Sequence, residues 1–232
     1  MKVGLFVTCL VDLVRPRIGF AALRLLEGAG CEVYVPPTQT CCGQPGWNSG
    51  ERNSAIALAG KLAAEFADCD YVVVPSGSCA GMIKLHYKDV LGHNPLAAKT
   101  YELTDFLASV LKLESVPGTF RGAVTYHDSC SGLRELGVKA QPRALLARIP
   151  GLSLREMKDC ETCCGFGGSF AVKLGEISSA MAGTKCRRIE ESGADAVVLG
   201  DLGCILNIEG RLSREGKPIP VLHVAEVLAG EA

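Results

Sequence analysis

The residues best able to do chemistry in this 232-residue chain are its twelve cysteines. Two of them begin Cys-Cys-Gly triplets, Cys41-Cys42-Gly43 and Cys163-Cys164-Gly165. Cysteine thiolates bind metals and take part in redox chemistry, whereas protonated, buried cysteines pack as small apolar side chains. The position of each cysteine along the chain therefore decides between these uses.

The triplets belong to a repeat that occupies both halves of the chain. Three pairs of cysteines recur in the same order at offsets of 122, 121 and 125 positions: Cys41 with Cys163, Cys9 with Cys130, and Cys79 with Cys204. Such self-similarity indicates an internal duplication. Pro117-Gly118 marks a turn at the boundary, so we predict a first lobe over residues 1–116 and a second over 117–232.

Each half shows the same alternation of strands and helices. Short apolar runs predict strands over 3–8, 32–36 and 71–75, and again over 123–127, 152–157 and 196–200. Helical stretches are predicted over 16–28, 53–67, 141–148 and 175–192. Strands that alternate with helices form parallel sheets through right-handed crossovers. The predicted fold class is α/β, with two Rossmann-like lobes related by an approximate two-fold axis.

The repeated cysteines follow the predicted strands in both halves. The first cysteine set is Cys9, Cys41, Cys42 and Cys79, and the second cysteine set is Cys130, Cys163, Cys164 and Cys204. Ligands bind at the carboxyl edge of a parallel sheet, where helix N-termini also favour thiolate over thiol. Four neighbouring thiolates repel one another unless a cation lies between them. Each lobe is therefore predicted to hold a metal centre.

The spacing of the thiols favours a multi-iron cluster over a single zinc ion. Adjacent cysteines can both ligate where the following glycine allows a sharp turn, and a cluster offers several ligand positions. Zinc usually takes its thiols from C-x2-4-C segments, which these sets do not form. The ferredoxin spacing C-x2-C-x2-C-x3-C-P is also absent from the sequence.

The order Cys, Cys-Cys-Gly, Cys, present twice, resembles a known family. This is the duplicated cysteine-rich (CCG) domain of iron–sulfur proteins from heterodisulfide reductase, glycolate oxidase and anaerobic glycerol-3-phosphate dehydrogenase. Residues 126–130 (YHDSC) and 164–168 (CGFGG) resemble the second-half signatures of its stand-alone lactate utilization branch. The resemblance covers essentially the whole chain.

The resemblance implies a redox subunit with a cysteine-bound iron–sulfur centre, for which the two cysteine sets would supply the ligands. For the lactate utilization branch it implies one protein of a three-part system that oxidises L-lactate to pyruvate, together with ferredoxin-domain or flavin proteins. No flavin or nicotinamide fingerprint occurs in the sequence, so we do not expect the chain to be active alone.

The chain departs from the fuller family pattern where that pattern ends each half in C-x-x-C. Met82 and Asn207 stand at the last position, which leaves four thiols in each half. Four thiols suit an ordinary [4Fe–4S] cluster, or zinc in the first lobe. Cys160 is a candidate spare ligand, and Thr38 stands at the corresponding place in the first half, so the second lobe is the favoured cluster site.

The remaining candidates have simpler interpretations beside the functional ones. Cys31, Cys69 and Cys186 lack a repeat partner and are predicted to pack as buried side chains. His127, three positions before Cys130, is a candidate proton carrier or hydrogen-bond donor beside the metal centre. Alternatively, its ring only makes a hydrogen bond to a backbone group at the end of a strand.

The leading functional hypothesis is an iron–sulfur electron-transfer subunit of an oxidoreductase. A zinc-stabilised assembly module is a second hypothesis, and a thiol–disulfide reductase that uses a vicinal cysteine pair is a third. The sequence lacks the thioredoxin C-x-x-C pattern at either triplet, which counts against the third.

Composition excludes several other classes. The 24 basic and 25 acidic residues give a net charge of −1, so no basic excess exists to neutralise nucleic-acid phosphates. No apolar run approaches the roughly 20 residues of a membrane span. Asp12 and Arg15 interrupt the first apolar segment, so we expect no export and a cytoplasmic location, where thiols stay reduced.

Overall fold

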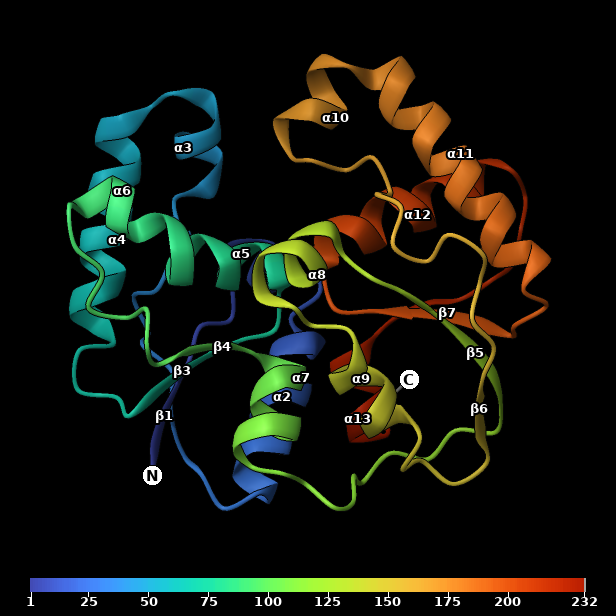
Figure 1. Ribbon diagram of the computed structural model, residues 1–232, viewed down its shortest axis with the longest axis horizontal. Helices are drawn as coiled ribbons and strands as arrows, with labels where there is room; N and C mark the ends of the chain where they lie inside the picture. Colours follow the sequence, from blue (N-terminus) through green and yellow to red (C-terminus); the bar gives the residue numbers. More distant parts are fainter. Residues whose placement is uncertain (232) are drawn as a thin grey trace.

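The computed structural model describes residues 1–231, which form two lobes lying side by side (Figure 1). The first lobe contains β1 (Lys2–Leu5), α1 (Cys9–Val14), α2 (Arg17–Gly28), β2 (Glu32–Tyr34), α3 (Gln44–Ser49), α4 (Arg52–Glu65), β3 (Tyr71–Val74), α5 (Gly77–Gly81), the π-helical turn η1 (Met82–His86), α6 (Tyr87–Leu91), β4 (Thr100–Glu102), α7 (Leu103–Asp105) and the π-helical turn η2 (Phe106–Val110). The second lobe contains β5 (Gly122–His127), α8 (Cys130–Leu136), α9 (Ala140–Leu146), β6 (Leu152–Leu154), α10 (Ser169–Lys173), α11 (Gly175–Glu191), β7 (Ala196–Leu199), α12 (Leu202–Arg214), β8 (Val221–His223) and α13 (Val224–Ala229).

Each lobe is built on a four-stranded parallel sheet, which confirms the predicted α/β class. The strand orders are β2-β1-β3-β4 and β6-β5-β7-β8. Val3 pairs with Tyr71 in the first sheet, and Val124 pairs with Ala196 in the second. Val3 and Val124 stand 121 positions apart, and Tyr71 and Ala196 stand 125 positions apart. These are the offsets of the cysteine pairs Cys9–Cys130 and Cys79–Cys204. The two sheets therefore share one hydrogen-bond register as well as one order of motifs.

The sequence prediction located six of the eight strands within the described residues. The edge strands β4 and β8 were missed because each leads directly into a helix, so no turn separates the strand from the next element in the sequence. The four predicted helices correspond to α2, α4, α9 and α11, but α12 was not predicted. Between residues 1 and 231, no helix has the length and apolar character that crossing a bilayer requires.

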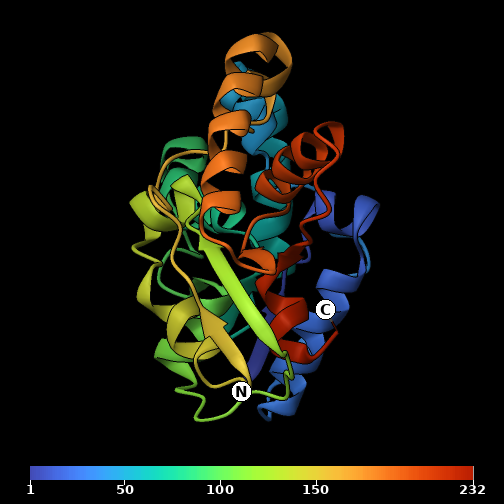
Figure 2. The same ribbon diagram turned by 90° about the vertical axis from the view of Figure 1, so that its right-hand side faces the viewer.

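One apolar core extends through both lobes. It joins Leu5 and Leu26 of the first lobe to Val198 and Leu228 of the second. Helix α13 of the second lobe packs on α2 of the first, as both views show, and α9 packs on α7 (Figures 1 and 2). The predicted boundary between the lobes, at residues 116 and 117, lies in the segment between η2 and β5. Because the apolar core continues from one lobe into the other, the division into two domains stays a prediction.

A single carboxylate joins the helices that follow β3 and β7. The Asp201 side chain accepts a hydrogen bond of 3.2 Å from Gly203 N and so caps α12. Ser76 caps α5, and its hydroxyl donates to Asp201 Oδ2 at 3.1 Å. Ser78 N donates to the same oxygen at 3.0 Å. The first turn of one helix in each lobe therefore depends on Asp201.

The lobes also meet where α5 packs on α8, near the centre of Figure 1. A Cβ atom added at Gly77 would lie 2.8 Å from Gly132 Cα and 2.9 Å from Gly132 N. The contact is backbone against backbone, so no flexible side chain can move aside. Glycine is needed here for the close approach of the two helices.

We therefore expect the substitution Gly77→Ala to lower the free energy of unfolding by about 1–3 kcal/mol, the range typical of overpacking. The matched control is Gly60→Ala in α4, where an added Cβ meets nothing within 4 Å. Alanine in an exposed helix interior should raise the free energy of unfolding by about 0.5–1 kcal/mol. Urea unfolding of the metal-free proteins measures both changes. Equal stability of the two variants would contradict the close contact.

Candidate metal centres

Each lobe brings cysteines to the carboxyl edge of its sheet, at the point where the strand order reverses. Cys9 is the first residue of α1, directly after β1, and Cys79 is the third residue of α5, after β3. Since β1 and β3 are neighbours whose connections leave in opposite directions, their carboxyl ends form the crevice where such sheets bind ligands. Cys130 and Cys204 have the same places after β5 and β7.

The first cysteine set forms a continuous series of sulfur contacts. The thiols of Cys9 and Cys42 both lie close enough to the sulfur of Cys41 to lower its pKa as hydrogen-bond donors. Cys42 Sγ lies 3.5 Å from Cys79 Sγ. Four sulfur atoms from three separate loops are therefore in contact in the order Cys9, Cys41, Cys42, Cys79.

The second cysteine set repeats this arrangement. Cys130 and Cys164 lie close enough to Cys163 to lower its pKa as hydrogen-bond donors, and Cys204 acts on the pKa of Cys164 in turn. Cys164 and Cys204 are buried, whereas Cys130 and Cys163 are partly exposed. The structure thus brings each of the eight predicted residues into a sulfur cluster with the other three of its set.

A left-handed glycine allows both cysteines of each pair to point toward the same centre. Gly43 and Gly165 have φ angles of +87° and +88°, which side chains other than glycine rarely adopt. Each glycine N–H points back at the first thiol of its pair, at 3.4 Å from Cys41 Sγ and 3.3 Å from Cys163 Sγ. The turns expected after the adjacent cysteines are therefore present.

The pKa values within each set are driven apart. Hydrogen bonds from Cys42 and Cys9 lower the pKa of Cys41 to about 3, and those from Cys130 and Cys164 lower the pKa of Cys163 to about 2. The neighbouring sulfur and burial raise the pKa of Cys9, Cys42, Cys130 and Cys164. Without a cation, the structure stabilises one thiolate in the centre of each set. Further thiolates need a positive charge between the sulfurs, so this donor set fits a thiolate-bound metal centre.

The other four cysteines lie apart from these sets. Cys31, Cys69 and Cys186 are buried, and burial raises the pKa of each thiol, as expected for packing residues. Cys160 Sγ lies 3.9 Å from the Arg143 guanidinium and beside Asp128. Within residues 1–231, Cys160 makes no contact with the thiols of the second set, so its use as a spare ligand requires movement.

His127 lies beside the second cysteine set. Its ring is fully buried, and one ring nitrogen and the sulfurs of Cys164 and Cys204 all lie within 4.8 Å of one another. Burial, with the nearby Lys185 ammonium, lowers the pKa of His127 to about 3, so the ring is neutral. The proton-carrying role expected from sequence stays a prediction, and the structure adds that His127 faces the thiols directly.

Several residues that hold the sites in place were not found from the sequence. Tyr87 donates to the backbone oxygen of Cys42 at 3.0 Å, and Asn207 donates to that of Cys164 at 2.8 Å. Buried Lys185 donates to the backbone oxygens of Asp159 and Cys160 at 2.7 and 3.2 Å. The capping residues Ser76 and Asp201 each stand three positions before a ligand candidate. A Ser or Asp at the start of a helix is a recognisable signal and could have identified them.

Comparison with known proteins defines the class to which these sites belong. Residues 3–84 and 124–209 each match the cysteine-rich domain family named CCG, and the chain belongs to this family. Over 98% of its length it is 50% identical to lactate utilization protein A of Geobacillus kaustophilus (strain HTA426), covering 98% of that protein. It is 45% identical to lactate utilization protein A of Bacillus subtilis (strain 168), covering 98% of this chain and 99% of that one.

The fold also has a counterpart among solved structures. A hypothetical protein from Helicobacter pylori superimposes with a TM-score of 0.71 over the whole of this chain and 49% of the other, at 15% sequence identity. At this identity the likeness concerns the fold alone. The expected family is thus confirmed, and the identity of the metal and the roles of the individual cysteines stay predictions.

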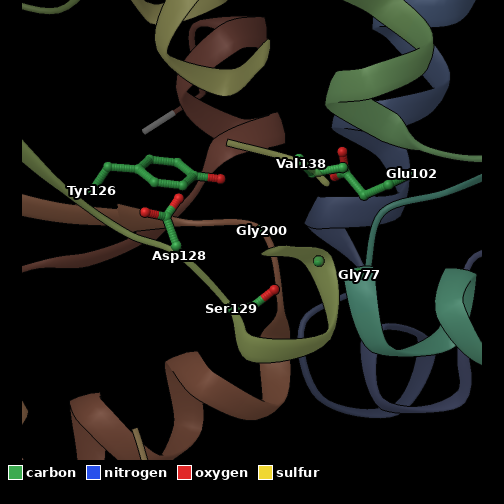
Figure 3. A pocket seen from close by; sticks show the side chains of 8 residues that line it. Gly77, Glu102, Tyr126, Asp128, Ser129, Val138 and Gly200 are labelled. Carbon is green, nitrogen blue, oxygen red and sulfur yellow. The ribbon is translucent and has the colours of Figure 1, made fainter. Parts of the chain in front are cut away.

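A small cavity of about 10 Å³, room for about one water molecule, lies between the two lobes. Tyr126 and Asp128 of the second lobe border it on one side and Glu102 of the first lobe on the other (Figure 3). Glu102 is 4% exposed, and its Oε2 accepts hydrogen bonds from the backbone N–H groups of Thr104 and Asp105. Burial outweighs these hydrogen bonds and raises the pKa of Glu102 to about 7.

Glu102 should therefore make the stability of the protein depend on pH. The folded state binds this proton up to about pH 7, whereas the unfolded chain releases it near 4.5, so the free energy of unfolding falls as pH rises between these values. The loss is complete above pH 7 and amounts to at most about 3 kcal/mol. Glu102→Gln keeps an oxygen for capping and should be more stabilising at pH 8 than at pH 5. Urea unfolding at both pH values measures this, and an equal effect at both would refute the shifted pKa.

Proposed function

We propose that the protein is the iron–sulfur electron-transfer component of a system that oxidises L-lactate to pyruvate. The observation that carries the proposal is the pair of four-sulfur clusters, each assembled from three loops in the same order. The name of the relatives that match over the full chain supports lactate utilization as the process. The charge balance and the sulfur-rich sites favour electron transfer over nucleic-acid binding.

In this proposal the second cysteine set holds a [4Fe–4S] cluster, and the first set holds either a second cluster or zinc. A bound iron–sulfur cluster accepts and releases electrons singly. The chain supplies four sulfur ligands to each centre, and Gly43 and Gly165 direct N–H groups at Cys41 and Cys163. The apolar surroundings of Cys42, which include Phe6 and Phe66, exclude water from the inner side of the first site.

The proposed function requires partners. Conversion of L-lactate to pyruvate releases two electrons and two protons: both electrons leave with one proton as a hydride to a cofactor such as a flavin, and the hydroxyl proton goes to a base. The sequence contains no fingerprint for such a cofactor, so we propose that a flavin or ferredoxin-domain protein oxidises the substrate and exchanges electrons with this chain. The protein is then a necessary subunit without activity of its own.

Anaerobic purification, followed by measurement of iron, acid-labile sulfide and the EPR spectrum, tests this function. We expect iron and sulfide in the second site, and in the first site as well if it holds a cluster. Deletion of the gene from its host should abolish growth on L-lactate but not growth on pyruvate. Zinc without sulfide, with partner binding unaffected by air, would instead support the assembly module. A Cys163–Cys164 disulfide that forms and breaks with turnover would support thiol–disulfide chemistry.

Substitution of the central thiol of each set should remove one centre at a time. Cys163→Ser and Cys41→Ser each remove a sulfur with two neighbouring thiols, so Cys163→Ser should lose the iron and sulfide of the second lobe and Cys41→Ser the metal of the first. Both should stay folded, because the apolar cores do not depend on the sites, and neither should restore growth on lactate. Cys31→Ala is the matched control, since this thiol is buried away from both sets. Full metal content in Cys163→Ser would refute the ligand assignment.

A further inference from the structure

The two cysteine sets are related by the duplication, but the side chain that follows the first strand of each lobe differs between them. The register of the sheets aligns β1 with β5, so that His127 at the end of β5 corresponds to Phe6 directly after β1. Both side chains are fully buried. Phe6 packs in the apolar cluster that contains Cys42, whereas His127 faces the corresponding Cys164. The second lobe thus places an imidazole where the first places a benzene ring.

His127 lacks the hydrogen bonds that a buried imidazole normally makes. Neither ring nitrogen has a hydrogen-bond partner, although both are inaccessible to solvent. An unsatisfied buried polar group costs about 1–3 kcal/mol, so its presence needs a physical reason. A ring nitrogen lies within 4.8 Å of the sulfurs of Cys164 and Cys204, so a metal bound by these sulfurs would provide that reason.

We propose that His127 is a fifth donor of the second metal centre and binds its metal through a ring nitrogen. This nitrogen, Cys164 Sγ and Cys204 Sγ lie within 4.8 Å of one another. Metal bonds to nitrogen and sulfur are about 2.0–2.3 Å long, so three atoms this close can be ligands of one metal centre. The inference rests on the proposed function, because it requires a metal in the second lobe.

Two features of the ring's surroundings support this role. The backbone of Cys160 lies close enough to the ring to act on it as a hydrogen-bond acceptor, although the contact falls short of full hydrogen-bond geometry. Metal-binding histidines usually donate the second ring N–H to such a carbonyl, which fixes the ring. Asn207 stands where the family pattern has a fifth thiol, and its side chain is engaged with the Cys164 carbonyl. Position 207 therefore offers no thiol to the second set, whereas His127 faces two of its sulfurs.

Isotope labelling of the unmutated protein provides the main test. Of the four histidines in the chain, His127 alone belongs to the group that surrounds the second set. Protein grown with ¹⁵N-histidine and reduced anaerobically should show a strong nitrogen coupling to the cluster in pulsed EPR spectra, changed in size by the isotope. A cluster without any histidine coupling would overturn the inference while leaving the proposed function intact.

The substitution His127→Phe gives the second lobe the side chain that the first lobe has at the corresponding position. It is made in a protein that also carries Cys41→Ser, which removes the first centre, so that the spectrum reports the second centre alone. We expect the variant to lose the nitrogen coupling and to shift the midpoint potential of the cluster. An unchanged spectrum and potential would contradict ligation. The reciprocal Phe6→His should leave the second centre unaltered and so controls for general effects of a buried substitution.

The two proposals fail in different ways. If the second site binds a single ion such as zinc, the cluster assignment falls, but Co²⁺ in its place still reports nitrogen ligation through the same isotope comparison. If the second lobe of the unmutated protein binds no metal under any condition, both proposals fall.

Discussion

The structure depends on one electrostatic constraint, the grouping of four sulfur atoms in each lobe. In each set the central thiol, Cys41 or Cys163, is the one whose pKa is strongly lowered, and it is surrounded by thiols that must stay protonated to donate to it. This arrangement is self-consistent without a metal, but it disfavours ionisation of the thiols on either side of the central one. A cation between the sulfurs removes that restriction, which explains why loops so distant in the chain converge twice on the same geometry.

The duplication preserves the sulfur positions but not the groups around them. Gly43 faces Ala55, and Gly165 faces Ser178, so α4 and α11 correspond at an offset of 123 positions. Lys185 then corresponds to Leu62, and His127 to Phe6. The first centre has apolar groups at these two places, and the second has a buried cation and an imidazole. A nearby positive charge and hydrogen-bond donors favour the reduced form of a cluster, so on the proposed function two centres with like thiols would differ in their affinity for electrons.

Sequence reasoning was most successful where long-range repetition carried the signal. The offsets of the cysteines predicted two similar lobes, and the position of each cysteine after a strand predicted that they would gather at the sheet edge. The edge strands β4 and β8 were missed because each continues directly into a helix without a turn signal between them. The contacts of Lys185 and Asn207 were also missed, because a buried lysine that donates to backbone oxygens looks, in sequence, like any lysine on a helix. Such roles depend on tertiary packing.

The contact between the lobes links the geometry of the two sets. Asp201 caps the helix that carries Cys204 and also accepts from Ser76 and Ser78, which begin the helix that carries Cys79. Helix α5 in turn packs through Gly77 on α8, whose first residue is Cys130. One ligand loop of the first set is thus in direct contact with two ligand loops of the second. Because the closest approach in this joint is between backbone atoms and its hydrogen bonds converge on one carboxylate, a shift of one ligand loop must be accommodated by the loops of the other set.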